Sequence, residues 1–369
     1  MSKNVIGVGL VGYGFAGKTF HAPLIRAVEG LDLRAIASSD PAKVKKDFPG
    51  ITVFADPAEM FSSDAIDLVV IATPNDSHAP LARAALAAGR NVVIDKPFTL
   101  DMEEARDLIV KAERRGLLLS VFHNRRWDSD FLAARFGVES GVLGRVTHFE
   151  SHIDRFRPEV RDRWRERKGL GAGVWYDLAP HMADQALQLF GLPDGVLGNL
   201  FLQRTGAQVD DWAHAVLLYP DLRVILHASM IAAGGSPRFL LHGDKGSLVK
   251  RGIDQQEAQL LEGMMPGAPG WGVDLDRMEI WNGAGACRGM PTPAGDHRKY
   301  YANIRDALGG EASNPVPPVQ ALAVMAVMEA AMASSAEGRL MPLPLTEEER
   351  AAFAASRKPK PRFSTAQVA

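Results

Sequence analysis

The feature that most constrains this chain is a short β-branched run near its N-terminus that ends in three glycines. Residues 5–17 read VIGVGLVGYGFAG, which predicts a buried first strand followed at once by a tight turn. Gly12, Gly14 and Gly17 have the G-x-G-x-x-G spacing of a dinucleotide site. In such a site the first glycine permits the turn, the second lets backbone N–H groups approach a pyrophosphate, and the third lets the helix pack closely on the strand.

A diphosphate would then lie at the N-terminus of the following helix, where unpaired N–H groups and the helix dipole favour negative charge. The alternative is an ordinary glycine-rich turn. The motif stands directly after an apolar strand and before an amphipathic stretch, and this position favours the nucleotide site.

The rest of the first third alternates apolar strands with helical stretches. Expected strands lie at 33–37, 66–72, 91–94 and 117–122, and expected helices lie at 18–28, 77–88 and 100–115. The stretch IDLVVIA at 66–72 is typical of a parallel strand that is covered on both faces. This order predicts a doubly wound Rossmann domain of the α/β class.

Beyond about residue 123, strand-like segments predominate. They lie at 146–153, 196–203, 213–219, 223–231, 239–243 and 247–249, and one helix at 177–190 interrupts them. This pattern predicts an α+β domain with a large, open, mostly antiparallel sheet, one face of which is free for a partner subunit. We expect a dinucleotide-binding domain over 1–122. A domain for substrate binding and oligomerisation should span 123–369, with a C-terminal segment that can pack back on the first domain.

Three stretches near the C-terminus complete the pattern. Residues 263–295 are rich in Gly and Pro and predict an irregular excursion. Residues 300–308 and 318–337 are typical of helices, and the second is apolar nearly all round, so we expect its methionines to fill a core. The tail from Lys358 carries prolines and polar residues, and we expect it to be loosely held.

The composition argues against several classes of protein. The net charge of −2 gives no reason to expect a nucleic-acid partner or a membrane surface, and no run of about 18 apolar residues predicts a membrane span. Cys287 is the only cysteine, which excludes an intrachain disulfide and a cysteine-cluster metal site. We expect a cytoplasmic protein, because cysteine is scarce and no signal-peptide pattern precedes the first strand.

A second nucleotide signal follows the expected second strand, where the ribose 2′-position is normally recognised. The strand ends in the residues ASSD. If Ser39 occupies the tip, Ser38, Ser39 and Lys43 can accept a 2′-phosphate. If Asp40 occupies it, the carboxylate favours NAD. We favour NADP, with NAD as the alternative, although the same residues also suit a simple turn.

Two further places carry chemistry. Lys96 follows the strand at 91–94, at the sheet edge where nucleotides bind. Asp177 and His181 are four residues apart and would share one face of a helix. Because Pro180 is tolerated only in the first turn, we expect that helix to begin near Asp177. The alternatives are a surface lysine, an N-cap aspartate and a buried core histidine.

Together, Lys96, Asp177 and His181 form one chemical hypothesis, the oxidation of a secondary alcohol. A histidine can take the hydroxyl proton as hydride leaves the carbon. A lysine ammonium beside the same oxygen stabilises the developing alkoxide, and an aspartate can bind a neighbouring hydroxyl. This chemistry requires no metal, and the sequence offers no obvious ligand cluster for one.

Four segments carry a family resemblance: GLVGYGFAGKTFHAPLI from residue 9, IATPNDSH at 71–78, VIDKPFTL at 93–100 and WYDLAPHMADQAL at 175–187. Together they resemble the glucose–fructose oxidoreductase / inositol dehydrogenase family, known as Gfo/Idh/MocA. The resemblance covers nearly the whole chain and implies a Rossmann domain, an open sheet domain and NAD(P)-dependent oxidation of a polyol, inositol or sugar. The family's Glu-Lys-Pro stands here as Asp95-Lys96-Pro97, and its Asp-x-x-x-His pair matches Asp177 and His181.

The segments at 122–131 and 150–164 resemble a narrower branch that contains NADP-linked scyllo-inositol dehydrogenases. The motifs and this resemblance together give the expected cofactor contacts: Gly12, Gly14, Phe15, Gly17, Ser38, Ser39, Lys43, Thr73, Pro74, Asn75, His78, Asp95, Lys96 and Asn124. The expected substrate contacts are His123, His152, Asp154, Arg155 and Trp164. The other arginines of the basic stretch at 154–168 are typical of a solvated loop.

Two functions remain open at this point. The first is a dehydrogenase, which we expect to be a homodimer or homotetramer. The second is a non-catalytic nucleotide or sugar sensor, since the family includes a eukaryotic galactose-pathway repressor that kept the fold and lost catalysis. The presence of both Lys96 and His181 favours the enzyme.

Overall fold

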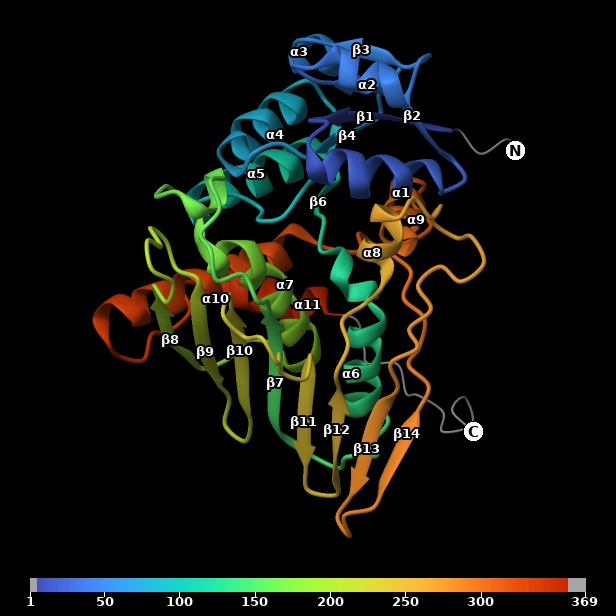
Figure 1. Ribbon diagram of the computed structural model, residues 1–369. Helices are drawn as coiled ribbons and strands as arrows, with labels where there is room; N and C mark the ends of the chain where they lie inside the picture. The colour runs from blue at the N-terminus through green and yellow to red at the C-terminus, as the bar shows by residue number, and fades with distance from the viewer. Residues whose placement is uncertain (1–4, 358–369) are drawn as a thin grey trace. The chain divides into compact units, whose positions relative to one another are not determined.

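The computed structural model describes residues 5–357, which form two compact units (Figure 1). The first unit contains the residues up to Asn124, Gln256–Trp271 and Asp296–Leu322, and the second contains Arg125–Gln255, Gly272–Gly295 and the residues from Ala323 onward. Each unit is thus assembled from three separate stretches of the chain. The tail expected to be loosely held lies outside the described residues.

The first unit is built on a six-stranded sheet in the order β3-β2-β1-β4-β5-β6. Its strands are β1 (Ile6–Val11), β2 (Leu31–Ala37), β3 (Thr52–Phe54), β4 (Leu68–Ile71), β5 (Asn91–Ile94) and β6 (Leu119–Val121). All neighbouring strands are parallel, which confirms the doubly wound Rossmann prediction. Every residue of β4 is buried, as its continuous apolar sequence predicted.

The helical segments of the first unit are η1 (Gly17–His21), α1 (Ala22–Arg26), α2 (Pro41–Asp47), α3 (Pro57–Phe61), η2 (Asn75–Ser77), α4 (His78–Ala87), α5 (Met102–Arg115), α8 (Gln256–Leu261) and α9 (Arg298–Leu308). The short helices α2 and α3 were not expected. Each begins with a proline, and the preceding aspartate, Asp40 or Asp56, caps it by accepting a backbone N–H. This Asp-Pro pattern was a visible signal that the sequence analysis did not use.

The second unit is built on an eight-stranded sheet in the order β14-β13-β12-β11-β7-β10-β9-β8. Its strands are β7 (Val146–Asp154), β8 (Gly195–Phe201), β9 (Trp212–Leu218), β10 (Arg223–Ser229), β11 (Phe239–Gly243), β12 (Gly246–Lys250), β13 (Met278–Asn282) and β14 (Cys287–Met290). The pairing is antiparallel except between β7 and β10. The predicted open, mostly antiparallel sheet is therefore confirmed.

The expected irregular excursion at 263–295 is wrong in part, because β13 and β14 form a hairpin at the edge of this sheet. Both strands are short and largely exposed, so their sequences lack the alternation of apolar and polar residues that marks a strand with one buried face.

The helical segments of the second unit are η3 (Asn124–Trp127), α6 (Ser129–Glu139), η4 (Trp164–Glu166), α7 (Gly173–Phe190), α11 (Glu347–Ser356) and most of α10 (Pro318–Glu337). Figure 1 shows α7 and α10 behind the sheet formed by β7–β10. The Trp175 indole of α7 donates a hydrogen bond to the carbonyl of Met328 in α10. By length and composition α10 could cross a membrane, but 67% of its apolar window is buried inside the protein, as in a core helix.

The expected start of α7 near Asp177 is wrong. The helix begins at Gly173, and Pro180 lies inside it. A partner distant in the sequence supports the first turn: the Asp210 carbonyl accepts the Val174 N–H at 2.8 Å, and its carboxylate accepts the Trp175 N–H at 2.7 Å. Because Asp210 satisfies these N–H groups, the helix extends one turn before Asp177, and Pro180 is its eighth residue.

Candidate functional site

The three glycines of the turn after β1 have different surroundings: two are closely packed, and one faces open space. Gly12 has φ +93°, and a Cβ there would lie 2.6 Å from the Ala72 carbonyl oxygen. A Cβ on Gly17 would lie 2.1 Å from the Gly12 carbonyl oxygen. A Cβ on Gly14 would have no described atom within 4 Å. The fold therefore requires Gly12 and Gly17, whereas Gly14 leaves room for a ligand.

This turn forms part of a cleft of about 500 Å³ at the carboxyl ends of β1, β2 and β4. The cleft contains seven of the expected cofactor residues: Gly12, Gly14, Ser38, Ser39, Lys43, Thr73 and Pro74. Phe15 begins the helical turn beside them and is 56% exposed. The location at the carboxyl edge of a parallel sheet and the open space at Gly14 fit a dinucleotide, whose diphosphate would meet the N-terminus of the following helix.

The tip of β2 presents Ser38 and Ser39 to this cleft. The Ser38 N–H donates to the Phe54 carbonyl of β3, which fixes the end of the strand. Asp40 also lines the cleft, but its carboxylate accepts the Lys43 N–H at 3.0 Å as the cap of α2. The Lys43 ammonium lies 5.9 Å from the centre of the Tyr13 ring. Two hydroxyls and an ammonium therefore stand where the adenosine ribose would be recognised.

Asp95 and Lys96 follow β5 at the same edge of the sheet. The Asp95 carboxylate accepts the Lys96 N–H at 2.8 Å and lies 3.8 Å from Nε2 of the buried His21. His21 Nδ1 contacts the Tyr301 hydroxyl at 2.6 Å. Burial raises the pKa of Asp95, but its interactions with the neighbouring His21, Lys96 and His78 outweigh burial, so the pKa is lowered. An anionic Asp95 thus anchors the backbone from which Lys96 projects.

His78 is buried beneath the cleft and not on its surface. Its Nδ1 lies 2.8 Å from the Pro97 carbonyl oxygen, and its Nε2 lies 3.1 Å from the Thr73 carbonyl oxygen. Burial lowers the pKa of this imidazole, although the charge of Asp95 opposes the shift. The ring thus ties together the loops that follow β4 and β5, and its expected contact with the cofactor stays a prediction.

The remaining residues expected at the cofactor or its edge have different surroundings. Asn75 lies in η2, immediately after the cleft residue Pro74. Asn124 is buried, and its side-chain amide lies 3.4 Å from His297 Nδ1. His123, expected at the substrate, is also buried. Neither Asn124 nor His123 lines the cleft at the ends of β1, β2 and β4.

In the second unit, α7 carries Asp177 and His181 one turn apart. His181 is buried. The Asp177 carboxylate has two cationic neighbours, Arg155 Nη1 at 3.5 Å and Arg165 Nε at 3.7 Å. Arg155 was expected at the substrate but Arg165 was not, since nothing in the sequence of a basic loop distinguishes one arginine from the next. Both guanidinium groups lie within ion-pair distance of the Asp177 carboxylate.

Other charged side chains near α7 form ion pairs with one another. Asp184, one turn after His181, binds Arg126 through contacts of 2.5 and 2.9 Å. Arg204 is buried and pairs with Glu166 and Asp211. Trp164 is 42% exposed, and the Arg165 guanidinium lies 4.8 Å from its ring. The stretch 154–168 thus combines fixed ion pairs with two arginines that face Asp177.

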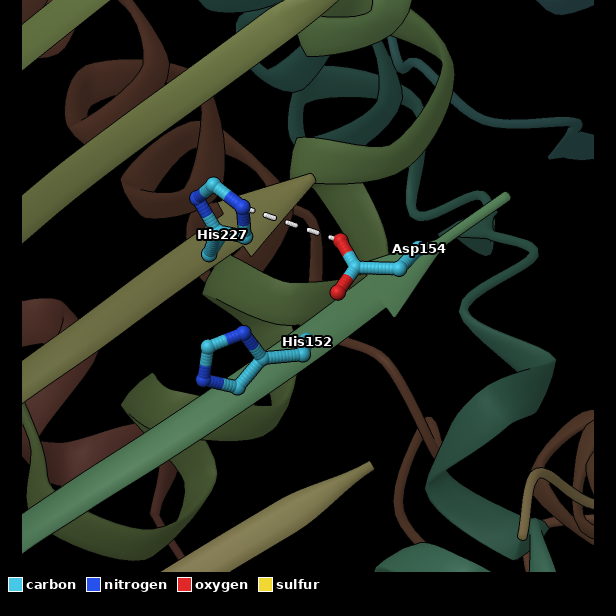
Figure 2. A group of neighbouring side chains, drawn as sticks. All are labelled: His152, Asp154 and His227. Carbon is cyan, nitrogen blue, oxygen red and sulfur yellow. Dashed lines mark ion pairs between the residues drawn. The ribbon is translucent and has the colours of Figure 1, made fainter. Parts of the chain in front are cut away.

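Two of the expected substrate residues, His152 and Asp154, lie on strand β7 of the large sheet. Along β7 the side chains alternate between faces, and Ser151 and Ile153 are buried on the face that carries α7. His152 and Asp154 point to the opposite face (Figure 2). His152 and Asp154 thus lie on a different face of the sheet from Asp177, and their contact with a substrate stays a prediction.

Comparisons with known proteins agree with this architecture. Residues 6–123 match the family model described as "Oxidoreductase family, NAD-binding Rossmann fold", and residues 137–345 match "Oxidoreductase family, C-terminal alpha/beta domain". A crystal structure of an oxidoreductase from Klebsiella pneumoniae superimposes with a TM-score of 0.92 at 56% identity, covering 96% of this chain and all of that one.

Two curated relatives also span nearly the whole chain. The uncharacterized oxidoreductase YdgJ of Escherichia coli is 52% identical over 338 residues, which are 91% of this chain and 97% of the relative. The scyllo-inositol 2-dehydrogenase (NADP(+)) IolW of Bacillus subtilis is 37% identical over 347 residues, which are 92% and 96% of the two chains.

Proposed function

Since the chain belongs to the Gfo/Idh/MocA oxidoreductase family and carries its NAD(P)-binding Rossmann domain, we propose that it is a dehydrogenase of polyols, inositols or sugars. In this proposal NADP exchanges a hydride with the carbon of a secondary hydroxyl or ketone. The observation that carries it is the cleft, in which open space at Gly14 adjoins a ribose position formed by Ser38, Ser39 and Lys43. A relative named as an NADP(+)-dependent scyllo-inositol dehydrogenase supports the substrate class.

The proposed roles follow from the chemistry of three side chains. His181 takes the hydroxyl proton during oxidation and returns it during reduction. Lys96 donates a hydrogen bond to the same oxygen and stabilises its developing negative charge. Asp177 accepts a hydrogen bond from a neighbouring substrate hydroxyl, and its ionised form is supported by Arg155 and Arg165. The arginines suit a carboxylate and not a protonated acid at this position.

The preference for NADP rests on the surroundings of the ribose position. Lys43 supplies a cation and the two serines supply hydroxyl donors, which together suit a 2′-phosphate. The one carboxylate at the strand end, Asp40, already accepts the Lys43 N–H. It therefore caps a helix and is less available to bind the two hydroxyls of an NAD ribose.

The test is an absorbance screen at 340 nm, the wavelength of the reduced nicotinamide, with inositol isomers and common aldoses against NADP and NAD. We expect turnover of at least one inositol or sugar and a kcat/KM for NADP above that for NAD. A ratio below one would overturn the NADP preference. Binding of NADP and a sugar without turnover across the panel would instead favour the sensor.

The proposal also includes a cytoplasmic homodimer or homotetramer. The large sheet of the second unit supports it, because β9 and β10 alternate buried side chains with partly exposed ones on the face away from α7. Light scattering at micromolar concentration measures the mass directly. A monomer would contradict the oligomer without affecting the proposed chemistry.

A further inference from the structure

A group of ligand-type side chains lies outside the proposed catalytic machinery, on the face of the second unit's sheet that points away from α7 (Figure 2). His152 and Asp154 belong to β7, and His227 belongs to the neighbouring strand β10. The parallel pairing sets His227 opposite His152. One potential ligand atom from each residue lies within 4.8 Å of the other two.

Hydrogen bonding fixes the proton on the far side of His152. Its Nε2 lies 2.6 Å from a carboxylate oxygen of Glu150, whose other oxygen lies 2.6 Å from His148 Nε2. Because a carboxylate can only accept, Nε2 of His152 carries a proton, and Nδ1 of the neutral imidazole then has the lone pair. This Nδ1 is buried and has no hydrogen-bond partner among residues 5–357.

His227 is held in a similar way. Its Nδ1 lies 3.3 Å from Nδ1 of His214, and its Nε2 faces Asp154 Oδ1 at 3.7 Å, the dashed line of Figure 2. Nε2 of His227 is therefore the ring nitrogen that faces the other two residues of the group.

Asp154 completes the group with a buried acceptor. Its side chain is 4% exposed, and within the described residues Oδ1 has no hydrogen-bond donor. The 3.7 Å gap to His227 is too long for a hydrogen bond. A buried carboxylate oxygen without a donor is costly, and a cation bound in the gap would remove that cost.

We propose that His152 Nδ1, Asp154 Oδ1 and His227 Nε2 form a binding site for a divalent transition metal of the zinc class. Two imidazoles and one carboxylate favour such a metal over Mg²⁺ or Ca²⁺, which prefer oxygen ligands. Three protein ligands leave a fourth tetrahedral position for water. Glu150 and His214 are the outer residues that orient the two imidazoles. When Zn–N and Zn–O bonds of about 2.0 Å form, the distance between any two of these ligand atoms must shorten to roughly 3.3 Å.

The first test is a zinc titration of the full chain, purified without a histidine tag and treated with a chelator. We expect one Zn²⁺ per chain in calorimetry. Co²⁺ should bind in its place and give the visible absorption band of a tetrahedral site. A stoichiometry near zero, or Co²⁺ that remains octahedral as in water, would overturn the proposal even if no variant could be prepared.

Substitutions identify the ligands. His227→Gln and Asp154→Asn each remove a proposed ligand and should weaken Zn²⁺ binding at least about 10-fold. Glu150 is not a ligand but orients His152, so Glu150→Gln should also weaken binding about 10-fold. His242→Gln is the matched control, because His242 belongs to the same sheet and its imidazole contacts the Ser247 hydroxyl and the His148 ring but none of the three proposed ligands. Equal loss in the control, or none in His227→Gln, would show that the zinc is bound adventitiously.

Discussion

Gly14 and Gly17 belong to one motif, yet a methyl group at each would meet different surroundings. The backbone of Gly14 is not in the left-handed region, and its Cβ position is empty. The Cβ position of Gly17 is occupied by the Gly12 carbonyl oxygen. The motif therefore combines a residue selected for the ligand with one selected for the fold, and substitution can separate them.

We expect Gly14→Ala to change the free energy of unfolding by less than about 0.5 kcal/mol but to raise the Kd for NADPH at least about 10-fold. Gly17→Ala should instead lower the free energy of unfolding by about 1–3 kcal/mol, because the helix must move away from the turn. Denaturant unfolding and fluorescence titration with NADPH measure the two quantities. Equal destabilisation by both substitutions would contradict the assignment.

Lys43 offers a second prediction at the scale of one residue. A hydrogen bond to a charged group is worth about 1.5–3 kcal/mol, so Lys43→Ala should lower kcat/KM for NADP roughly 10- to 100-fold. The value for NAD, which lacks the 2′-phosphate, should change little. Lys46→Ala is the control, since Lys46 lies on the same short helix, α2, and does not line the cleft. A parallel fall for both cofactors would place Lys43 away from the ribose.

At the scale of elements, α7 depends on a residue that follows it in the chain. Asp210 lies 35 residues after Trp175, and its carbonyl and carboxylate accept the N–H groups of Val174 and Trp175, the second and third residues of the helix. Gly173 permits this contact, because its φ is +94° and a Cβ there would lie 2.1 Å from the Asp210 carboxylate. The helix that carries Asp177 and His181 is thus positioned partly by a half-buried acid.

This acid makes stability depend on pH in a definite direction. Burial raises the pKa of Asp210 from 3.8 to about 6, despite the opposing hydrogen bond from Trp175. Between about pH 4 and pH 6 the folded chain keeps a proton that the unfolded chain has released, so the free energy of unfolding falls as pH rises. The raised pKa of Asp210 lowers the free energy of unfolding by on the order of 2–3 kcal/mol once the pH exceeds about 6.

We therefore expect the Asp210→Asn variant to lack the fall in unfolding free energy that Asp210 causes between about pH 4 and pH 6. The difference in unfolding free energy between wild type and variant should shift in favour of the variant as pH rises from 4 to 6. Urea unfolding at several pH values measures it. Asp221→Asn, at an exposed carboxylate, should leave the slope unchanged. A constant difference between the Asp210 variant and wild type over this range would contradict the raised pKa.

The elements also show what local sequence can and cannot predict. β5 and β11 have the predicted bounds because each is a short apolar run that burial on the sheet makes regular. The start of α7 was wrong because its cap comes from Asp210, far along the chain. The β13–β14 hairpin was missed because exposed edge strands have little apolar pattern.

At the scale of the whole molecule, the chain leaves the first unit after Asn124 and returns to it twice. The residues that return include Tyr301, whose hydroxyl contacts His21 beneath Asp95. No local pattern predicts such a contact, since the two residues are 280 positions apart. The cleft could be predicted because its glycines directly follow β1 in the sequence and its serines directly follow β2. The grouping of His152 with His227 was not, because it depends on the register between β7 and β10.

The proposed catalytic groups belong to different units, Lys96 to the first and Asp177 and His181 to the second. If Lys96 and His181 act on one oxygen in one step, Lys96→Met and His181→Gln should each lower kcat at least about 100-fold. The double variant should then be only a few-fold slower than the slower single variant, because residues that act as a unit are not additive.

Single-turnover kinetics with bound NADP and a substrate found in the screen measures these rates, and titration with NADPH shows whether each variant still binds cofactor. Lys245→Met is the control, since Lys245 is an exposed lysine of the second unit. Losses that multiply in the double variant would mean that the two groups serve separate steps. A variant of Lys96 or His181 with full kcat would remove that residue from the chemistry, and binding without turnover in the wild type would then favour the sensor.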